Sequence, residues 1–214
     1  MCKLKSAIIL KDRIFMPDYD SHSKMLEELG ITDDYINASK VFVRAELSPA
    51  DGDVFSDIDG WKLEVDQDIT PEWFDEKDCA ERMRKAVKEW SKTHIFVGQN
   101  ELKISHGENI FIKDCKNVDI RGSATVTSIY DSATVKYICG KATVKSICGK
   151  ATVENIYDSA TVENIYGNAT VISSPYTKWN NSTSLIISDN ATFKDCYSKT
   201  IYQAGVWKFV EVKK

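Results

Sequence analysis

The residues of this chain that are best suited to chemistry are carboxylates, and they are concentrated in one span. Between Glu46 and Glu81 the sequence has thirteen acidic residues and only two basic ones, Lys62 and Lys77. Carboxylates at this density can bind a hard cation or attract a positively charged partner. The candidate contact residues of this acidic span are Asp51, Asp53, Asp57, Asp59, Asp66, Asp68, Glu72 and Asp75.

Two stretches contain the residue types of a metal site, but neither has the spacing of one. The stretch DYDSH (Asp18 to His22) has two carboxylates and an imidazole, a composition that a polar loop ahead of a helix shares. The stretch DGDVFSDIDGW is acidic enough for a calcium loop. On the EF-hand template, however, Phe55 takes the first ligand position and Asp66 replaces the required Glu. We therefore expect no metal and no other cofactor.

Catalytic motifs are also missing from the sequence. The histidines are His22, His94 and His106, and none belongs to an HExxH motif. The sequence has no P-loop, no GxGxxG and no GxSxG nucleophile elbow. Cys139 and Cys148 stand where related segments have tyrosine, which favours a half-buried packing position over a reactive thiol. We therefore expect a protein that is not an enzyme.

The acidic span lies in a region, residues 1–98, whose patterns alternate between strand and helix. The stretches SAIIL, RIFM, KVFVRAEL and WKLEVD predict strands. The stretch SHSKMLEELG predicts a helix that Ser21 or Ser23 caps and Gly30 ends. The stretch TPEWF predicts a helix start with Thr70 as cap, and apolar residues then recur every three or four positions from about Asp75 to Lys92.

The second region, residues 99–205, contains a tandem repeat of nine residues. Its consensus is A-T-V-x-x-I-[YC]-[DG]-[SKN], and the units begin at Ala124, Ala133, Ala142, Ala151, Ala160 and Ala169. Nine residues are too few for a pair of helices, so each unit must be a strand and a turn. Ala and Val then face inward, Thr faces outward, and Asp or Gly turns the corner. The predicted outer ladder is Thr125, Thr134, Thr143, Thr152, Thr161 and Thr170.

The number of units in each coil is open at this stage. Two units would give a flat roll of about 18 residues per coil, and three a triangular helix of about 27. The corner series Gly122, Asp131, Gly140, Gly149, Asp158, Gly167 repeats every three units and slightly favours the triangular helix. Intertwined chains of a trimer are a third arrangement. The stretches NIFIKDCKNVDIRG and SLIISDNATFKDC read as degenerate coils, and residues 206–214 as a capping strand.

Composition places the chain among globular proteins of a reducing compartment. Of its 214 residues, 43% are hydrophobic and 28% are charged. Its first apolar run, AIIL, is too short for a secretory signal, and its six cysteines form no CxxC pair. We expect a cytoplasmic protein with no membrane association. The first hundred residues carry 21 acids against 14 bases, a net charge that discourages direct DNA binding.

Three stretches of the first region, FMPDYDSHSKMLEELG, VFVRAEL and VDQDITPEWFD, precede tandem repeats with a Thr-Val core. In this the chain resembles a group of phage and prophage proteins of gut bacteria, which carry a similar N-terminal domain and nine-residue repeats of the S-T-V-Q type. This chain has Ala-Thr-Val in place of Ser-Thr-Val. The resemblance implies a viral context and a repeat number that recombination can change. The group has no assigned activity, so the resemblance implies no catalytic residues.

Together these patterns predict an α+β N-terminal domain followed by an all-β solenoid of nine-residue repeats. The expected function is that of a phage-type interaction protein in the bacterial host cytoplasm. It would bind a host protein or sequester a small ligand, with inhibition of a host defence as one form of this role. The alternatives are a self-assembling structural protein, for which a homo-oligomer is expected, and an enzyme that uses a metal in its acidic loops.

Overall fold

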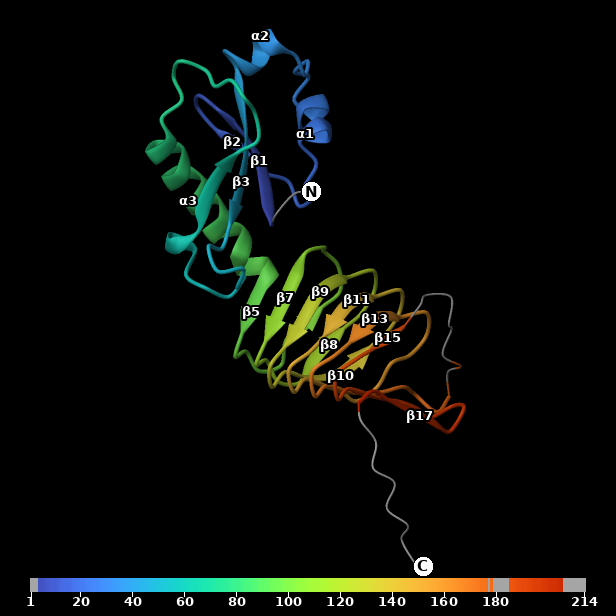
Figure 1. Ribbon diagram of the computed structural model, residues 1–214. Helices are drawn as coiled ribbons and strands as arrows, with labels where there is room; N and C mark the ends of the chain where they lie inside the picture. Colours follow the sequence, from blue (N-terminus) through green and yellow to red (C-terminus); the bar gives the residue numbers. More distant parts are fainter. Residues whose placement is uncertain (1–3, 177, 179–184, 206–214) are drawn as a thin grey trace, which may run out of the picture. The chain divides into compact units, whose positions relative to one another are not determined.

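The structure is a computed structural model that describes residues 4–176, 178 and 185–205. It divides into two compact units, Met1–Ile95 and Phe96–Lys214 (Figure 1). Strand β5 (Ile95–Val97) already belongs to a solenoid sheet, ahead of residue 99 where the sequence places the start of that region. The predicted capping strand, residues 206–214, lies outside the described residues. In the described part of the chain, no helix is long and apolar enough to cross a membrane.

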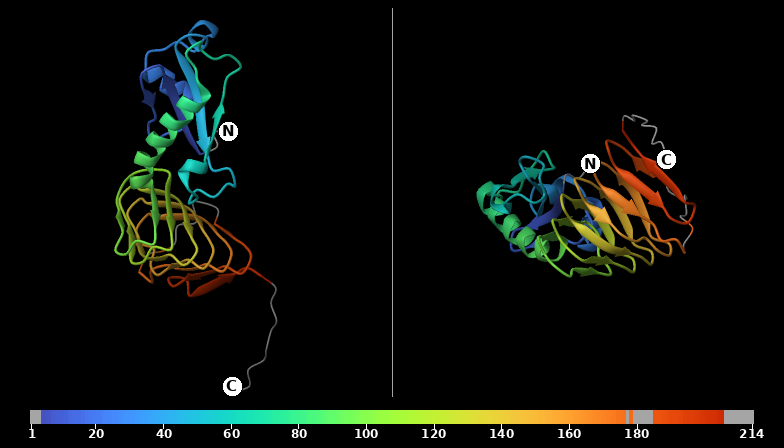
Figure 2. Two further views of the ribbon diagram at one scale, coloured as in Figure 1. Left: turned by 90° about the vertical axis from the view of Figure 1, so that its left-hand side faces the viewer. Right: turned by 90° about the horizontal axis from the view of Figure 1, so that it is seen from below.

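The N-terminal unit is built on an antiparallel sheet with the strand order β2-β1-β3-β4. Its strands are β1 (Lys5–Leu10), β2 (Ile14–Phe15), β3 (Phe42–Ser48) and β4 (Lys62–Val65). Strand β1 is buried along its whole length because helices cover both faces of the sheet. Helix α1 (His22–Glu28) lies on one face and helix α3 (Glu76–His94) on the other (Figure 2). Ile8 packs with Leu26 of α1, and Ile9 packs with Cys79 of α3.

The helices of this unit begin at polar caps. They are α1 (His22–Glu28), α2 (Tyr35–Ala38), the 3-10 helix η1 (Ile58–Gly60) and α3 (Glu76–His94). Of the two predicted caps, Ser21 and Ser23, it is Ser21 that caps α1, because its hydroxyl accepts a hydrogen bond from the Lys24 amide. The helix start predicted at Thr70 is wrong, whereas the helical periodicity from about Asp75 to Lys92 is confirmed. Pro71 instead forms a turn with Phe74, and α3 begins only after Asp75, whose carboxylate accepts from the Asp78 amide at 2.8 Å.

The second unit is the predicted β-solenoid, and its strands form two parallel stacks. One sheet has the order β15-β13-β11-β9-β7-β5, and the other β16-β14-β12-β10-β8-β6, with β17 added antiparallel at its end. Beyond β5, the strands are β6 (Lys103–Ile104), β7 (Ile110–Lys113), β8 (Val118–Ile120), β9 (Thr125–Tyr130), β10 (Thr134–Ile138), β11 (Thr143–Ile147), β12 (Thr152–Val153), β13 (Thr161–Ile165), β14 (Thr170–Ile172), β15 (Ile186–Ile187), β16 (Thr192–Asp195) and β17 (Thr200–Gln203).

Each regular coil contains two repeat units, which settles the question that the sequence left open. Thr143 pairs with Thr125 on one side and with Thr161 on the other, so every second unit stacks on the same sheet. Thr143 and Thr161 lie 18 positions apart in the chain. The slight preference for three units was therefore wrong, since the order of Asp and Gly at the corners does not follow the stacking. All of these pairings lie within one chain, so the coils do not need intertwined subunits.

The repeat consensus is explained by this stacking. The Ala, Val and Ile residues of the units line a single core between the two sheets. The predicted threonine ladder divides into two columns, one on each sheet. Thr125, Thr143 and Thr161 share one sheet, where the Thr161 hydroxyl donates to the Thr143 hydroxyl at 3.1 Å, and the other three share the opposite sheet.

The corners use Asp and Gly, as predicted, and the structure shows two reasons. The backbone there is left-handed, with φ of 68° at Gly149 and 56° at Asp158. An Asp at a corner also bonds the neighbouring coil, because the Asp158 carboxylate accepts from the Gly140 amide at 3.1 Å. Gly149 has no room for a side chain, since an added Cβ would lie 2.7 Å from the Asp131 amide nitrogen.

The coils at the two ends of the stack are irregular. Ile110 pairs with Val126 and Ile112 with Ile129, so the coil near the start is shorter than the regular ones and contains a register shift. At the other end the coil is longer. Val171 pairs there with Phe193, and the hydrogen-bonded Ser173 and Asp195 lie 22 positions apart. Both stretches that the sequence identified as degenerate coils therefore join the stack, as predicted.

Asp195 ends strand β16 and holds the following turn. Its carboxylate accepts hydrogen bonds from the Ser173 hydroxyl at 3.1 Å, the Tyr197 amide at 3.1 Å and the Ser198 hydroxyl at 2.6 Å. Burial alone would raise the pKa of Asp195, but the hydrogen bonds from Ser198, Ser173 and Tyr197 lower it below its ordinary value of 3.8.

We expect Asp195→Asn to lower the free energy of unfolding at pH 7 by about 1–3 kcal/mol. Because the pKa is lower in the folded chain, the carboxylate stabilises the fold fully above about pH 4 and loses this effect as the pH falls through its folded pKa. The difference between the variant and the wild type should therefore be smaller at pH 3 than at pH 7 in urea unfolding. Glu154→Gln, at an exposed carboxylate of the solenoid, is the control. An equal difference at both pH values would contradict the assignment.

Candidate functional site

The predicted acidic residues stand in several different local settings. In the loop between β3 and β4, Asp51, Asp53 and Asp57 each accept a hydrogen bond from the amide two residues later, at 2.9–3.1 Å. These bonds are local turns that fold the loop on itself. Asp59 pairs with Lys88 of α3 at 2.6 Å. The four carboxylates therefore shape and anchor the loop.

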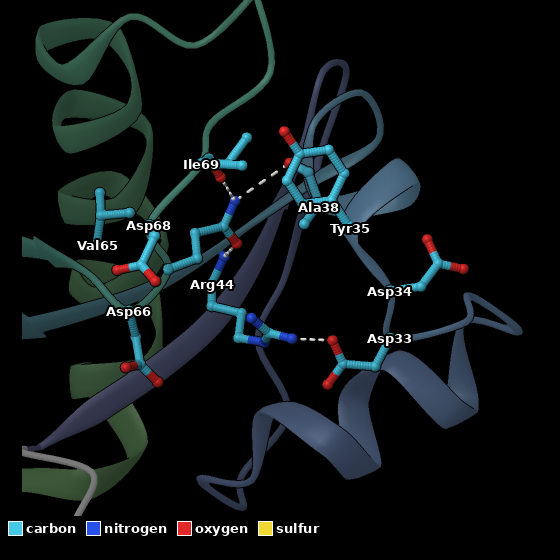
Figure 3. A pocket seen from close by; sticks show the side chains of 10 residues that line it. Asp33, Asp34, Tyr35, Ala38, Arg44, Val65, Asp66, Asp68 and Ile69 are labelled. Atoms are coloured by element: carbon cyan, nitrogen blue, oxygen red, sulfur yellow. Dashed lines mark hydrogen bonds and ion pairs between the residues drawn. The ribbon is translucent and has the colours of Figure 1, made fainter.

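The other half of the predicted set divides into structural and pocket residues. Asp75 caps α3, and Glu72 is exposed in the turn ahead of it. Asp66 and Asp68 follow strand β4 and line an open pocket of about 680 Å³. Across this pocket lie Asp33 and Asp34, which precede α2, so that carboxylates stand on two sides of it (Figure 3). The residues that line this acidic pocket are Asp33, Asp34, Tyr35, Ala38, Arg44, Val65, Asp66, Gln67, Asp68 and Ile69.

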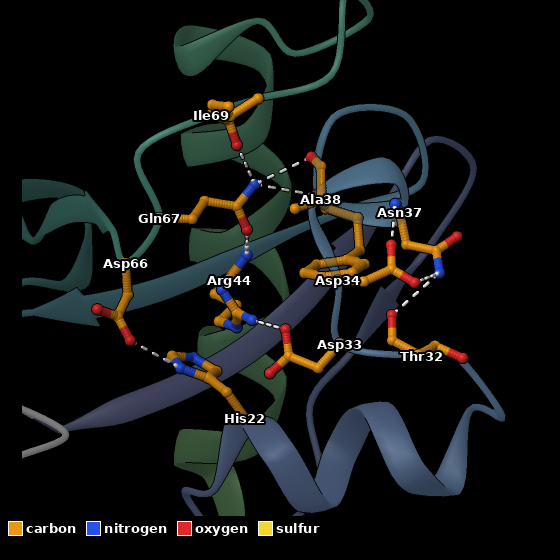
Figure 4. A network of polar contacts seen from close by, with 11 residues as sticks. His22, Thr32, Asp33, Asp34, Asn37, Ala38, Arg44, Asp66, Gln67 and Ile69 are labelled. Carbon is orange, nitrogen blue, oxygen red and sulfur yellow. Dashed lines mark hydrogen bonds and ion pairs between the residues drawn. The ribbon is translucent and has the colours of Figure 1, made fainter.

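Gln67 fixes the position of the two acids beside it. Its side-chain oxygen accepts from the Arg44 amide at 2.8 Å, and its side-chain nitrogen donates to the carbonyl oxygens of Ala38, Phe42 and Ile69 (Figure 4). One amide group thus joins α2, β3 and the segment after β4. Because Gln67 faces inward, Asp66 and Asp68 on either side of it are exposed.

The pocket carries an excess of negative charge. Among the described residues that line it, four are carboxylates and one, Arg44, is a cation. The Arg44 guanidinium pairs with Asp33, so it neutralises one carboxylate. At the rim the Tyr35 side chain is 72% exposed, a large aromatic surface next to these charges. The arrangement suits a cationic ligand, because carboxylates and an aromatic face both attract a positive charge.

Sequence reasoning missed Asp33, Asp34 and Arg44 as members of this site. The two acids form an adjacent pair followed by Tyr35, but they lie outside the dense acidic span between Glu46 and Glu81. The fold brings them to the pocket because α2 and the segment after β4 both contact β3.

The stretch DYDSH does not converge on one site. Asp20 forms an ion pair with the fully buried Lys5 at 3.1 Å, and Asp18 lies 3.4 Å from the His94 ring.

His22 turns the other way, and its Nδ1 lies 3.2 Å from a carboxylate oxygen of Asp66 (Figure 4). The group that comes together is His22, Glu46 and Asp66, whose ligand atoms all lie within 4.8 Å of one another.

The solenoid cysteines occupy packing positions. Cys148 is 3% exposed and its thiol lies 3.6 Å from the Ile129 carbonyl oxygen. Burial raises the pKa of the Cys148 thiol and, in the same way, that of Cys139. A raised pKa leaves less thiolate at neutral pH, which is the opposite of what a nucleophile needs.

Comparison with known proteins adds no relative to this picture. The chain matches no family model, no curated protein and no solved structure.

Proposed function

We propose that the chain is a non-enzymatic, phage-type interaction protein that binds a basic segment of a host protein in the bacterial cytoplasm. The observation that supports this most directly is the acidic pocket, where carboxylates from two separate segments face each other beside an exposed tyrosine. A Lys or Arg side chain fits such a pocket, because it can pair with a carboxylate and stack on Tyr35. The resemblance to phage proteins favours a host target, and inhibition of a host defence is the proposed biological result.

The pocket can be tested first with a defined probe, a fluorescent oligo-arginine peptide. We expect it to bind the full chain with an affinity that falls steeply with added salt, since exposed charges are screened. Asp68→Asn and Tyr35→Ala should each weaken binding by about two- to fivefold, and the double variant by roughly tenfold. The matched control is Glu72→Gln, which removes an exposed carboxylate of the same acidic span outside the pocket.

The same variants then serve as baits in host lysate. A host protein that the wild type and Glu72→Gln capture, but the double variant does not, would identify the partner. Equal peptide binding by all variants would contradict the pocket as the binding site. A small polycation, eluted in place of a protein, would show that the same charges sequester a ligand instead.

Self-assembly is a second candidate function, and the last described coil favours it. Ile186 of β15 is 59% exposed and Ile201 of β17 is 61% exposed, so apolar side chains face outward at this end of the stack. Apolar association persists at high salt, whereas capture of a basic segment does not. If this candidate holds, sedimentation over a range of concentrations should show oligomers at high salt. The variant Ile201→Lys should then sediment as a monomer. A monomer at all concentrations would exclude it.

A further inference from the structure

His22 lies in a polar environment that a neutral imidazole does not satisfy. The side chain is 7% exposed, at the start of α1. Its Nε2 lies 3.2 Å from the Ala45 carbonyl oxygen, and its Nδ1 lies 3.2 Å from the Asp66 carboxylate. Both neighbours are acceptors, but a neutral imidazole has only one N–H to donate. One nitrogen of a neutral ring therefore turns a lone pair towards an oxygen, unless both ring nitrogens carry protons or a metal ion lies between ring and oxygen.

A second carboxylate, which unlike Asp66 is buried, completes this group. Glu46 follows Ala45 on β3 and is 8% exposed, and strand register places it opposite Glu64 of β4. The ligand atoms of Glu46, His22 and Asp66 all lie within 4.8 Å of one another, so three side chains of metal-binding type converge here.

We propose that His22, Glu46 and Asp66 bind one divalent transition-metal ion of the Zn²⁺ or Mn²⁺ class. In this arrangement Nε2–H donates to the Ala45 carbonyl and leaves the Nδ1 lone pair for the ion. A backbone carbonyl behind a ligating histidine is the usual way to fix the ring. A set of one imidazole and two carboxylates suits these ions, whereas Ca²⁺ prefers oxygen ligands alone.

The distances are compatible with such an ion. Ligand bonds of about 2.1 Å in a tetrahedral site put the ligand atoms roughly 3.4 Å apart. The pair of Nδ1 and the Asp66 oxygen is already at 3.2 Å, and all three ligand atoms lie within 4.8 Å. A rotation of the Glu46 carboxylate would close the set. The Asp66 side chain is 66% exposed, so a fourth position would face solvent and take water.

The test is a calorimetric titration of the full-length chain with ZnCl₂ and with MnCl₂, with CaCl₂ for comparison. We expect one Zn²⁺ and one Mn²⁺ per chain, and weaker or no binding of Ca²⁺. Asp66→Asn should weaken binding at least about tenfold, and Glu46→Gln similarly, since each removes a ligand. Glu72→Gln removes an exposed carboxylate that belongs neither to this group nor to the pocket, and should bind the ions as the wild type does.

The choice of Asp66→Asn and of Mn²⁺ guards against two artefacts, a variant that does not fold and binding of the ion by cysteine thiols. Asp66 is exposed, so its Asn variant should fold even if the buried Glu46→Gln variant does not. Mn²⁺ avoids thiolate ligands, so its loss in Asp66→Asn cannot come from the cysteines. Equal binding by wild type and Asp66→Asn, or no binding at neutral pH, would overturn the proposal. Proton–nitrogen spectra that show His22 protonated on both nitrogens with Zn²⁺ present would also overturn it.

Discussion

Replacing Gly149 with alanine should destabilise the solenoid by about 2–5 kcal/mol, because two costs add. The residue has a φ of 68°, which costs any residue with a side chain about 1–2 kcal/mol. The new Cβ would also lie 2.7 Å from the amide nitrogen and 2.8 Å from the Cα of Asp131 on the neighbouring coil. Backbone cannot yield as a flexible side chain can, so the two coils must separate. Thermal unfolding followed by circular dichroism should show a midpoint lower by roughly 5–15 °C.

Gly98→Ala separates the two costs. Gly98 has a φ of 64°, close to that of Gly149, but an added Cβ would meet nothing within 4 Å. This variant should therefore lose only about 1–2 kcal/mol. If the two variants were equally stable, the close approach between coils at Gly149 would not be a determinant of the fold.

Deletion of residues 142–159 should leave a folded solenoid, whereas deletion of residues 142–150 should not leave a complete one. The longer deletion removes a whole coil, β11 and β12, so that β13 can stack on β9 and β14 on β10 in the original register. In a solenoid each coil contacts only its neighbours, so the loss is limited to one coil's contribution. The shorter deletion removes half a coil and transfers every later strand to the opposite sheet.

The damage from the shorter deletion should appear at the new junction between coils. The deletion places Asp158 at the corner above Asp131, where Gly149 stands in the wild type and an added Cβ has no room. The longer deletion places Gly167 at this corner. Hydrogen exchange in residues 151–165 should therefore be fast after the shorter deletion, whereas residues 160–165 should remain slow after the longer one. Equal protection in both would mean that the coils do not depend on which sheet a unit joins.

The solenoid could be predicted because its information is local and repeated. Every unit buries an Ala and a Val in the core, as Ala142 and Val144 do in theirs, because each unit meets nearly the same neighbours. A strand with a turn is the only element that fits nine residues. The size of the coil could not be obtained in this way. The order of Asp and Gly at the corners suggested three units, but Gly140 and Gly149 are required by the backbone of the coil beneath each of them. That is a contact between residues one full coil apart, which no single unit encodes.

The candidate site was predictable only in part, because its members come from distant segments. Asp66 and Asp68 were named from the density of acids alone, yet Asp51, Asp53 and Asp57 in the same span fold their own loop. A carboxylate that caps a turn and one that faces a pocket look alike in a sequence. The members of the group of His22, Glu46 and Asp66 are far apart in the chain, at spacings that match no motif. Only the antiparallel register of β3 and β4 brings Glu46 and Asp66 close.

The regular stacking also has a consequence for how the chain folds. Val144 pairs with Val126 on one neighbouring coil and with Val162 on the other. Strands that pair one coil out of register therefore bury the same kinds of side chain as correctly paired strands. The middle of the solenoid therefore contains little information about register, and slipped pairings are kinetic traps of nearly native energy. The irregular end coils distinguish the correct alignment: the shifted pairing at Ile110 and the large Phe193 each fit in one place only. Folding that starts at an end coil proceeds in register, whereas folding that starts in the middle has to search for it.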